Sequence, residues 1–216
     1  MKTRLTLTTP TFSTLLQRLG SQDHSFRPRY NIGCGQWHWL VRPVRHVRGQ
    51  VEVVRSLWGL PSNMDRPLSY VTAESLSRRG LRKVARCVIP IDGFYGRLGD
   101  RMKDPIWFHA HNGSILWAAG IHGVDRQGRD AFALITCQAN ALVAQAQGRM
   151  PVLLTWREAP GWLSPTAEEP SLQAIMHPEL TDCLRAREVS GRVNHPDLDD
   201  PLCIEAEAKA QQLSFF

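Results

Sequence analysis

The sequence lacks the features that mark several common classes of protein. No apolar run is long enough to span a membrane, and the N-terminus has no apolar signal-peptide core. The five cysteines are scattered and show no Cys-x-x-Cys spacing, so neither a disulfide framework nor a cysteine-ligated zinc site is indicated. His109 and His111 lack the further ligands that a metal site needs. We therefore expect a cytoplasmic protein with reduced thiols, no metal and no other cofactor.

Lysine is also scarce, and charge is distributed unevenly along the chain. Arginine outnumbers lysine 22 to 4, and the net charge of +6 combines +11 over residues 1–108 with −5 over residues 109–216. Guanidinium groups bind phosphate bidentately and stack on bases, so an arginine-rich half indicates nucleic acid as a partner. A solvated surface in an organism with arginine-biased codons explains the same composition. Charge alone leaves both interpretations open.

Hydropathy patterns predict many short strands and a few short helices. Strands are expected at residues 3–9, 37–47, 51–57, 88–95, 105–110, 115–121, 131–137, 152–154, 188–193 and 202–205. Helices are expected at residues 10–19, 72–83, 139–146, 155–163 and 171–185. Because strands and helices do not alternate regularly, an α+β domain is favoured over a doubly wound parallel sheet.

The most informative stretch is residues 86–97, RCVIPIDGFYGR. Residues 88–91 predict a buried strand, and Asp92-Gly93 predicts a turn at its end. The stretch resembles the signature R-C-[IVL]-[IV]-P-x-D-G-[FW]-[YF]-E-W of the SOS response-associated peptidase (SRAP) family. Further segments resemble motifs of that family in the same order: RYNI at 29–32, WGL at 58–60, KDPIWF at 103–108, LWAAGI at 116–121, ITCQAN at 135–140, GRMPVL at 148–153 and VSGRVN at 189–194.

The resemblance covers about residues 1–205 and leaves residues 206–216 as a C-terminal tail. It implies a single SRAP-like domain in which mixed, mostly antiparallel sheets form a barrel-like core with short peripheral helices. Members of the family bind single-stranded DNA and capture abasic sites. The resemblance therefore implies single-stranded or damaged DNA as the partner, and we expect a monomer without membrane association.

Three catalytic side chains of the family are replaced in this chain. The family uses an N-terminal Cys, a Glu and a His, and the matching positions hold Lys2, Gly96 and Gln147. Neither glycine nor an amide can act as a general acid or base, and losing one member of a catalytic unit removes most of its rate. The resemblance thus implies DNA binding without covalent crosslinking or self-processing. Two alternatives remain open: an active abasic-site crosslinking enzyme or peptidase that uses altered residues, such as a Schiff base on Lys2, and an interaction adapter that no longer binds DNA.

Groups that match the DNA-holding part of the family are present. Arg4, Thr136 and Arg149 fall where the family contacts phosphates and sugar, Asn31 lies in the RYNI motif, and Trp58 matches a base-stacking edge. A stacked aromatic side chain contributes about 1–3 kcal/mol to single-strand binding. Packing in the core is the alternative role for Trp58 and for Thr136.

The last five residues form a motif of their own. Gln212, Leu213, Phe215 and Phe216, with a serine between them, resemble the bacterial sliding-clamp binding motif Q-L-[SD]-L-F. Two adjacent phenylalanines at an exposed terminus are an unusual liability for a soluble protein. The resemblance implies recruitment to the replication clamp. The alternative is that the phenylalanine pair docks on the domain's own core.

Overall fold

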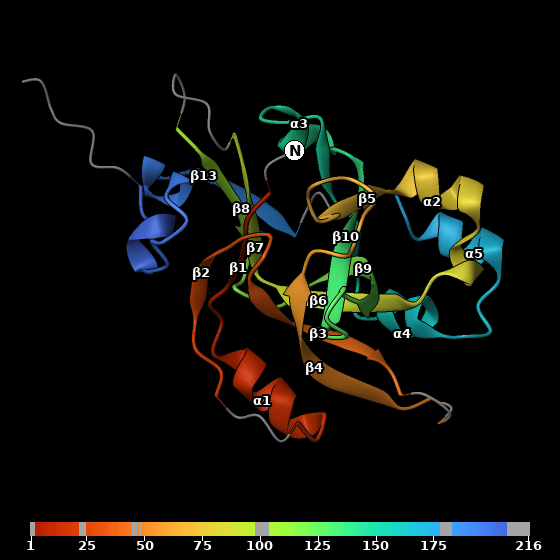
Figure 1. Cartoon of the computed structure of the whole chain (residues 1–216). Helices are drawn as coiled ribbons and strands as arrows, with labels where there is room; N and C mark the ends of the chain where they lie inside the picture. Colours follow the sequence, from red (N-terminus) through yellow and green to blue (C-terminus); the bar gives the residue numbers. More distant parts are fainter. Residues whose placement is uncertain are drawn as a thin grey trace, which may run out of the picture.

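The computed structural model describes residues 3–21, 25–44, 47, 49–97, 104–177 and 183–206. Two β-sheets form the centre, and short helices lie around their outside (Figure 1). This confirms the α+β class with mixed, mostly antiparallel sheets and short peripheral helices. No helix within the described ranges is both long and apolar enough to cross a membrane.

Five strands of the larger sheet close into a ring. They follow the order β10-β4-β3-β6-β9, and β9 pairs again with β10. Their bounds are β3 Trp37–Pro43, β4 Val51–Trp58, β6 Arg86–Ile91, β9 Leu116–Val124 and β10 Asp130–Gln138. Neighbours in the ring are antiparallel except β4 and β10. The predicted hairpin of residues 37–57 is confirmed by the β3–β4 pairing.

Three short strands extend this ring on its outside. They are β5 Tyr70–Thr72 and β11 Arg149–Pro151, which both pair with β10, and β12 Leu153–Leu154, which pairs with β9. Alternate residues of β10 point into a tightly filled interior, where Phe132 and Leu134 are fully buried. Because β10 pairs with four other strands, it is the element that positions residues from β5 and β11 beside one another.

The second sheet is antiparallel throughout and has the order β13-β8-β7-β1-β2. Its strands are β1 Leu5–Leu7, β2 Arg29–Ile32, β7 Gly93–Gly96, β8 Ile106–Ala110 and β13 Leu184–Glu188. Leu5, Phe94 and Phe108 place their side chains in the same core as the ring. The two sheets therefore share one hydrophobic core.

Asp92 forms the junction between the sheets. The predicted strand at residues 88–91 and the predicted turn at Asp92-Gly93 are confirmed, and the chain leaves the ring after β6 and enters the second sheet as β7. The buried Asp92 carboxylate accepts hydrogen bonds from the Thr6 hydroxyl (2.6 Å), from the Thr8 amide and hydroxyl (2.5 and 2.7 Å) and from the Thr9 amide (2.8 Å). A buried carboxylate satisfied by this many donors fixes the end of β1 against the turn.

Gly93 follows, at a position where only glycine fits. A Cβ there would lie 2.3 Å from Trp107 Nε1 and 2.8 Å from the Thr6 hydroxyl. These distances are far below van der Waals contact, and both atoms are held, since Trp107 Nε1 donates to that hydroxyl. The Asp92-Gly93 pair thus forms the turn between β6 and β7, and Gly93 also allows Trp107 and Thr6 to pack closely against the backbone.

The helices are short, and side chains cap two of the α-helices. They are α1 Thr11–Arg18, α2 Ala73–Arg79, α3 Ala141–Ala144, α4 Glu158–Leu163 and α5 Glu169–Ala174, with the 3₁₀-helix η1 at Leu81–Lys83. Thr72 accepts a hydrogen bond from the Ser75 amide at the start of α2, and Asn140 accepts one from the Val143 amide at the start of α3. The predicted helix start at Asn140 is confirmed.

The C-terminal part differs most from the sequence-based expectation. The predicted helix 171–185 ends at Ala174, and β13 occupies residues 184–188 at the edge of the second sheet. The predicted strands 188–193 and 202–205 are wrong beyond Glu188, because η2 (Gly191–Asn194) and η3 (Pro201–Ile204) are 3₁₀-helices. Ser190 and Asp200 cap them by accepting from amides two residues ahead, which favours a tight turn over an extended strand.

Candidate nucleic-acid interface

Gly96 and Gln147 lie side by side, although 51 positions separate them in the sequence. An ideal Cβ on Gly96 would lie 3.4 Å from both Cδ and Oε1 of Gln147. Gly96 ends β7, and Gln147 follows α3 just before β11. The two positions that the resemblance matched to a catalytic Glu and His are thus adjacent, and neither holds an ionisable group.

A side chain at Gly96 has little room. Its Cβ would lie 2.9 Å from Cε2 of Phe108, and that ring is buried and stacked on Phe94 at 5.3 Å between centroids. The phenyl ring and the Gln147 amide fill the space that an acidic side chain would need. Gln147 Nε2 is buried without a hydrogen-bond partner among the described residues, so one donor in this pocket is unused.

Arg4 and Asn31 form a second contact near the N-terminus. Arg4 Nη1 donates to Asn31 Oδ1 at 3.0 Å. Asn31 is fully buried, and its Nδ2 lies within hydrogen-bonding distance of the backbone carbonyls of Val193, His195 and Leu198. The amide of Asn31 therefore ties the C-terminal segment to β2 and orients Arg4. Only Arg4 of this pair, which is half-buried, has remaining donors for a ligand.

Thr136 and Arg149 are brought together by the pairing of β10 with β11. Arg149 Nε donates to the Thr136 hydroxyl at 3.3 Å, and Nη2 donates to the Thr136 carbonyl at 2.7 Å. The outer edge of the guanidinium pairs with Glu74 of α2, with Nη1–Oε1 and Nη2–Oε2 distances of 3.3 and 2.8 Å. These hydrogen bonds from Arg149 lower the pKa of the Glu74 carboxyl below its ordinary value.

Trp58 lies in the core and not on a surface. Its side chain is 1% exposed, its ring stacks on Phe132 at 6.0 Å, and Nε1 donates to the Ser69 carbonyl at 2.7 Å. A base cannot reach a ring in this environment. The packing role fits Trp58, and we leave it out of the proposed DNA contacts.

Two contacts at this site were not predicted from the sequence. Glu74 occupies the guanidinium fork of Arg149. Arg97, next to Gly96, has a positive φ of 57° and lies 3.6 Å from a Glu188 carboxylate oxygen. The sequence predicts that Arg97 follows the end of a strand, but it does not predict its left-handed backbone conformation or its contact with Glu188.

Several predicted residues lie outside the described ranges. These are Lys2 and the four tail residues Gln212, Leu213, Phe215 and Phe216. Within the described ranges, no three His, Cys, Asp or Glu side chains cluster in a way that could hold a metal ion. His109 stacks on Trp107 at 4.2 Å between ring centroids.

The model of the SOS response associated peptidase (SRAP) family matches residues 1–196. Abasic site processing protein YoqW of Bacillus subtilis (strain 168) is 32% identical over 201 residues, which are 85% of this chain and 88% of that protein. Abasic site processing protein YobE of the same organism is 31% identical over 193 residues, 82% of this chain and 87% of that protein.

Solved structures share the fold at lower identity. A crystal structure of a protein from Bordetella bronchiseptica has a TM-score of 0.67 at 20% identity and covers 88% of this chain and 100% of that one. One from Bacteroides thetaiotaomicron has a TM-score of 0.65 at 21% identity, covering 81% and 82%. Since the family model spans nearly all of the domain and relatives above 30% identity align over most of their length, the chain belongs to the SRAP family.

Proposed function

We propose that this protein acts in the response to DNA damage by binding single-stranded or abasic-site DNA without crosslinking to it. The adjacency of Gly96 and Gln147 carries the proposal, because the place where the family's acid–base pair is expected contains an amide and a phenyl ring. A proton-transfer step needs an ionisable group within hydrogen-bonding reach. The similarity to abasic site processing proteins supports abasic-site DNA as the ligand class.

The proposed phosphate contacts are Arg4 and Arg149. Both guanidiniums are half-buried and oriented by a side-chain partner, Asn31 for Arg4 and Thr136 for Arg149. A pre-oriented guanidinium loses little rotamer entropy when it binds phosphate, and it can do so bidentately. The two arginines lie on different sheets, which suits a strand that crosses from one sheet to the other.

In the decisive experiment, the full chain is incubated with an abasic single-stranded oligonucleotide, and the mixture is analysed by two methods. A denaturing gel is expected to show no shifted band, whereas fluorescence anisotropy in solution is expected to show binding. A band that survives denaturation, and that disappears in Lys2→Ala, would instead establish covalent chemistry through an altered residue. Absence of binding to both plain and abasic strands would favour the adapter interpretation.

Salt dependence identifies the phosphate contacts. Arg149→Ala is expected to reduce the slope of log K against log salt by about 1, as expected for one lost phosphate contact. Arg157→Ala is the matched control, since it removes the same charge from an arginine that packs over Trp156 on α4's N-terminal side. Equal slopes for both variants would contradict the role of Arg149.

We also propose that the C-terminal pentapeptide binds the sliding clamp. The support is the match of Gln212, Leu213, Phe215 and Phe216 to the clamp-binding motif. Short linear motifs of this kind bind weakly and gain from tethering. Deleting residues 212–216 is expected to abolish clamp binding in a pull-down and to leave the melting temperature unchanged; a large fall in melting temperature would favour docking on the domain itself.

A further inference from the structure

A pocket of about 420 Å³ lies apart from the residues discussed so far. It is lined by Leu7, Ser25, Phe26, Arg27, Arg29, Trp37, His38, Trp39 and Arg55. These come from the end of β1, the segment before β2, the first residue of β2, and the strands β3 and β4. The volume falls in the range of about 300–1,000 Å³ that is typical of small-molecule sites. None of the lining residues belongs to the candidate nucleic-acid interface.

The pocket is strongly cationic. Three of the nine described residues that line it are arginines, and none of these nine is acidic. Arg29 forms an ion pair with Asp199 and also donates to Gln36. Arg27 and Arg55 are exposed, and within the described ranges neither forms an ion pair. Two guanidinium groups therefore have donors available for an anion.

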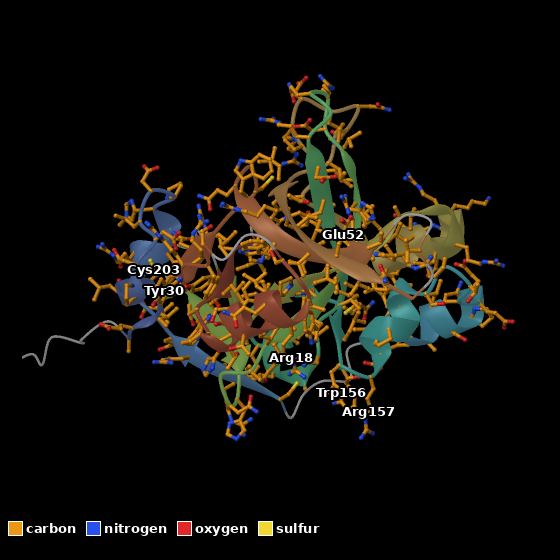
Figure 2. The ribbon with its side chains drawn as sticks, turned by 90° about the horizontal axis from the view of Figure 1, so that it is seen from below. Arg18, Tyr30, Glu52, Trp156, Arg157 and Cys203 are labelled. Atoms are coloured by element: carbon orange, nitrogen blue, oxygen red, sulfur yellow. The ribbon has the colours of Figure 1, made fainter. Side chains whose placement is uncertain are left out.

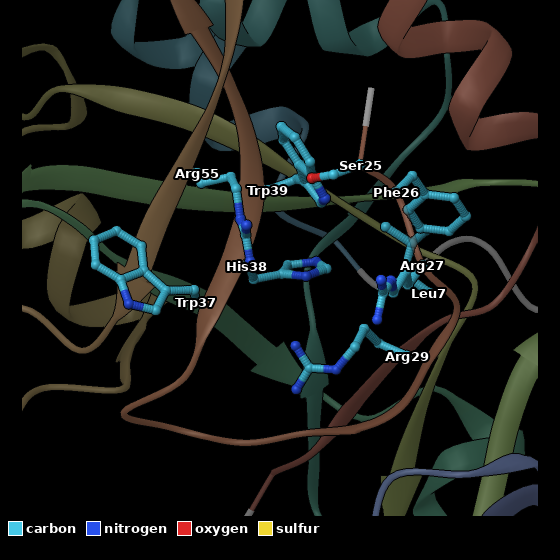
Figure 3. A pocket seen from close by; sticks show the side chains of 9 residues that line it. All are labelled: Leu7, Ser25, Phe26, Arg27, Arg29, Trp37, His38, Trp39 and Arg55. Atoms are coloured by element: carbon cyan, nitrogen blue, oxygen red, sulfur yellow. The ribbon is translucent and has the colours of Figure 1, made fainter. Parts of the chain in front are cut away.

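Aromatic side chains form the other walls. The Trp37 side chain is 39% exposed, whereas Trp39 is almost buried and lies under the Arg55 guanidinium at 5.7 Å. Arg55 is the cross-strand partner of Trp39 in the β3–β4 ladder, which fixes their stacking. Figure 3 shows the side chains of Arg27, Arg29 and Arg55 around the imidazole of His38. An exposed indole thus lines the same pocket as two guanidiniums that have no ion-pair partner within the described ranges.

His38 forms a neutral wall of this pocket. It is buried, and its Nε2 lies 2.8 Å from the Pro90 carbonyl, so Nε2 carries the hydrogen. Burial is the main reason that the pKa of His38 is lowered to about 4; the positive charges of Arg29 and Arg55 also lower it, and the hydrogen bond to the Pro90 carbonyl opposes this. The positive charge in the pocket therefore comes from the arginines and does not depend on the state of His38 near neutral pH.

We propose that this pocket binds a nucleotide, with the base stacked on Trp37 and the phosphate held by Arg27 and Arg55. Indole rings are the best stacking surfaces for bases, and guanidinium forks match phosphate oxygens. A simple anion would leave the indole unused, and an uncharged aromatic molecule would leave the guanidiniums unused. The nucleotide is either free or part of a single strand. The site is independent of the interface around Arg149.

The test is a titration of the full chain with deoxyadenosine monophosphate (dAMP), in which binding is measured by tryptophan fluorescence and, separately, by calorimetry. Saturable binding is expected, with weaker binding of deoxyadenosine and of inorganic phosphate tested separately. Trp37→Ala is expected to weaken dAMP binding by about five- to 150-fold, the range that one stacked base contributes. Trp37→Phe should recover much of it, which separates loss of stacking from loss of folding.

A matched control exists elsewhere on the surface. Trp156 is 72% exposed and lies under an arginine, Arg157, at 5.1 Å, and both project from the periphery of the molecule (Figure 2). Trp156→Ala and Arg157→Ala are expected to leave dAMP binding unchanged, whereas the Arg27→Ala/Arg55→Ala double variant should lose it. Arg149→Ala should also leave dAMP binding unchanged, so this test is separate from that of the proposed function.

A short single-stranded oligonucleotide distinguishes the two sources of the nucleotide. If the oligonucleotide displaces dAMP, and if Trp37→Ala weakens its binding, the pocket holds one nucleotide of a single strand. If it does not displace dAMP, the pocket serves a free nucleotide. The proposal is overturned if dAMP shows no saturable binding, if inorganic phosphate binds as tightly as dAMP, or if Trp37→Ala and Trp156→Ala reduce binding equally.

Discussion

The carboxylate of Glu74 occupies the outer edge of the Arg149 guanidinium, with oxygen–nitrogen distances of 2.8 and 3.3 Å. Arg149 is one of the two guanidiniums assigned here to phosphate. A DNA phosphate must therefore displace Glu74 or share the fork with it. The carboxylate competes directly for these donors and also repels the strand.

Glu74→Gln is accordingly expected to strengthen binding of single-stranded DNA. Exposed ion pairs contribute about 0–1 kcal/mol, so the gain is at most about fivefold at low salt and smaller at high salt. Fluorescence anisotropy across a salt series measures it. Glu168→Gln removes the same charge from an exposed residue that makes no cap hydrogen bond at the start of α5, and it should change little. A weaker complex for Glu74→Gln would mean that Glu74 assists binding by orienting Arg149.

Asp92→Ala is expected to destabilise the domain strongly. The substitution leaves the Thr6 hydroxyl and the Thr8 and Thr9 amides without their acceptor at the junction of the two sheets. Hydrogen bonds to a charged group contribute about 1.5–3 kcal/mol each, so a loss of about 3 kcal/mol or more in the free energy of unfolding is expected. Urea denaturation measures it, with the exposed Asp65→Ala as control. A loss below about 1 kcal/mol would show that the junction does not depend on this carboxylate.

Gly96→Ala is expected to lower the free energy of unfolding by about 1–3 kcal/mol, because the new methyl group overpacks the core against Phe108. Gly148→Ala is the matched control, since nothing lies within 4 Å of the Cβ position there and φ is not in the left-handed region. Thermal unfolding of the two variants compares the same substitution at nearby positions. Equal melting temperatures would mean that the Phe108 ring moves aside readily and that a larger side chain is tolerated at Gly96.

The pH dependence of stability should show the titration of His38. In the folded protein its pKa is about 4, against about 6.5 in an unfolded chain. Above about pH 6.5 His38 is neutral in both states. As pH falls from about 6.5 to about 4, only the unfolded chain binds the proton, so the free energy of unfolding decreases by up to about 3 kcal/mol.

Denaturant unfolding at several pH values between about 7.5 and about 4.5 measures this slope. His38→Gln keeps an amide donor toward Pro90 and cannot titrate. The difference in stability between wild type and His38→Gln should therefore change steadily through the window. A constant difference would mean that His38 is accessible to protons in the folded protein.

The sequence by itself determined the family and much of the local structure. Ordered motifs such as residues 29–32 and 189–194 are short enough to read directly, and they match the family model over residues 1–196. Alternation predicts the β3–β4 hairpin, and Asn140 predicts the start of α3 through a capping bond made within three residues. Each of these features depends on residues that are close together in the chain. The sequence pattern was therefore sufficient to predict them.

Tertiary structure decided the features that depend on distant partners. The turn at Asp92-Gly93 was predicted, but the placement of β6 and β7 in different sheets follows from Asp92 finding its donors in residues 6–9, and β13 is a strand because β8 offers it a free edge. No pattern in the sequence places Glu74 on Arg149 or gathers Arg27, Arg29 and Arg55 around Trp37 and His38. Glu74 and Arg149 are 75 positions apart, and the pocket combines residues of β1, β2, β3 and β4, so only the packing of the sheets around one core brings them together.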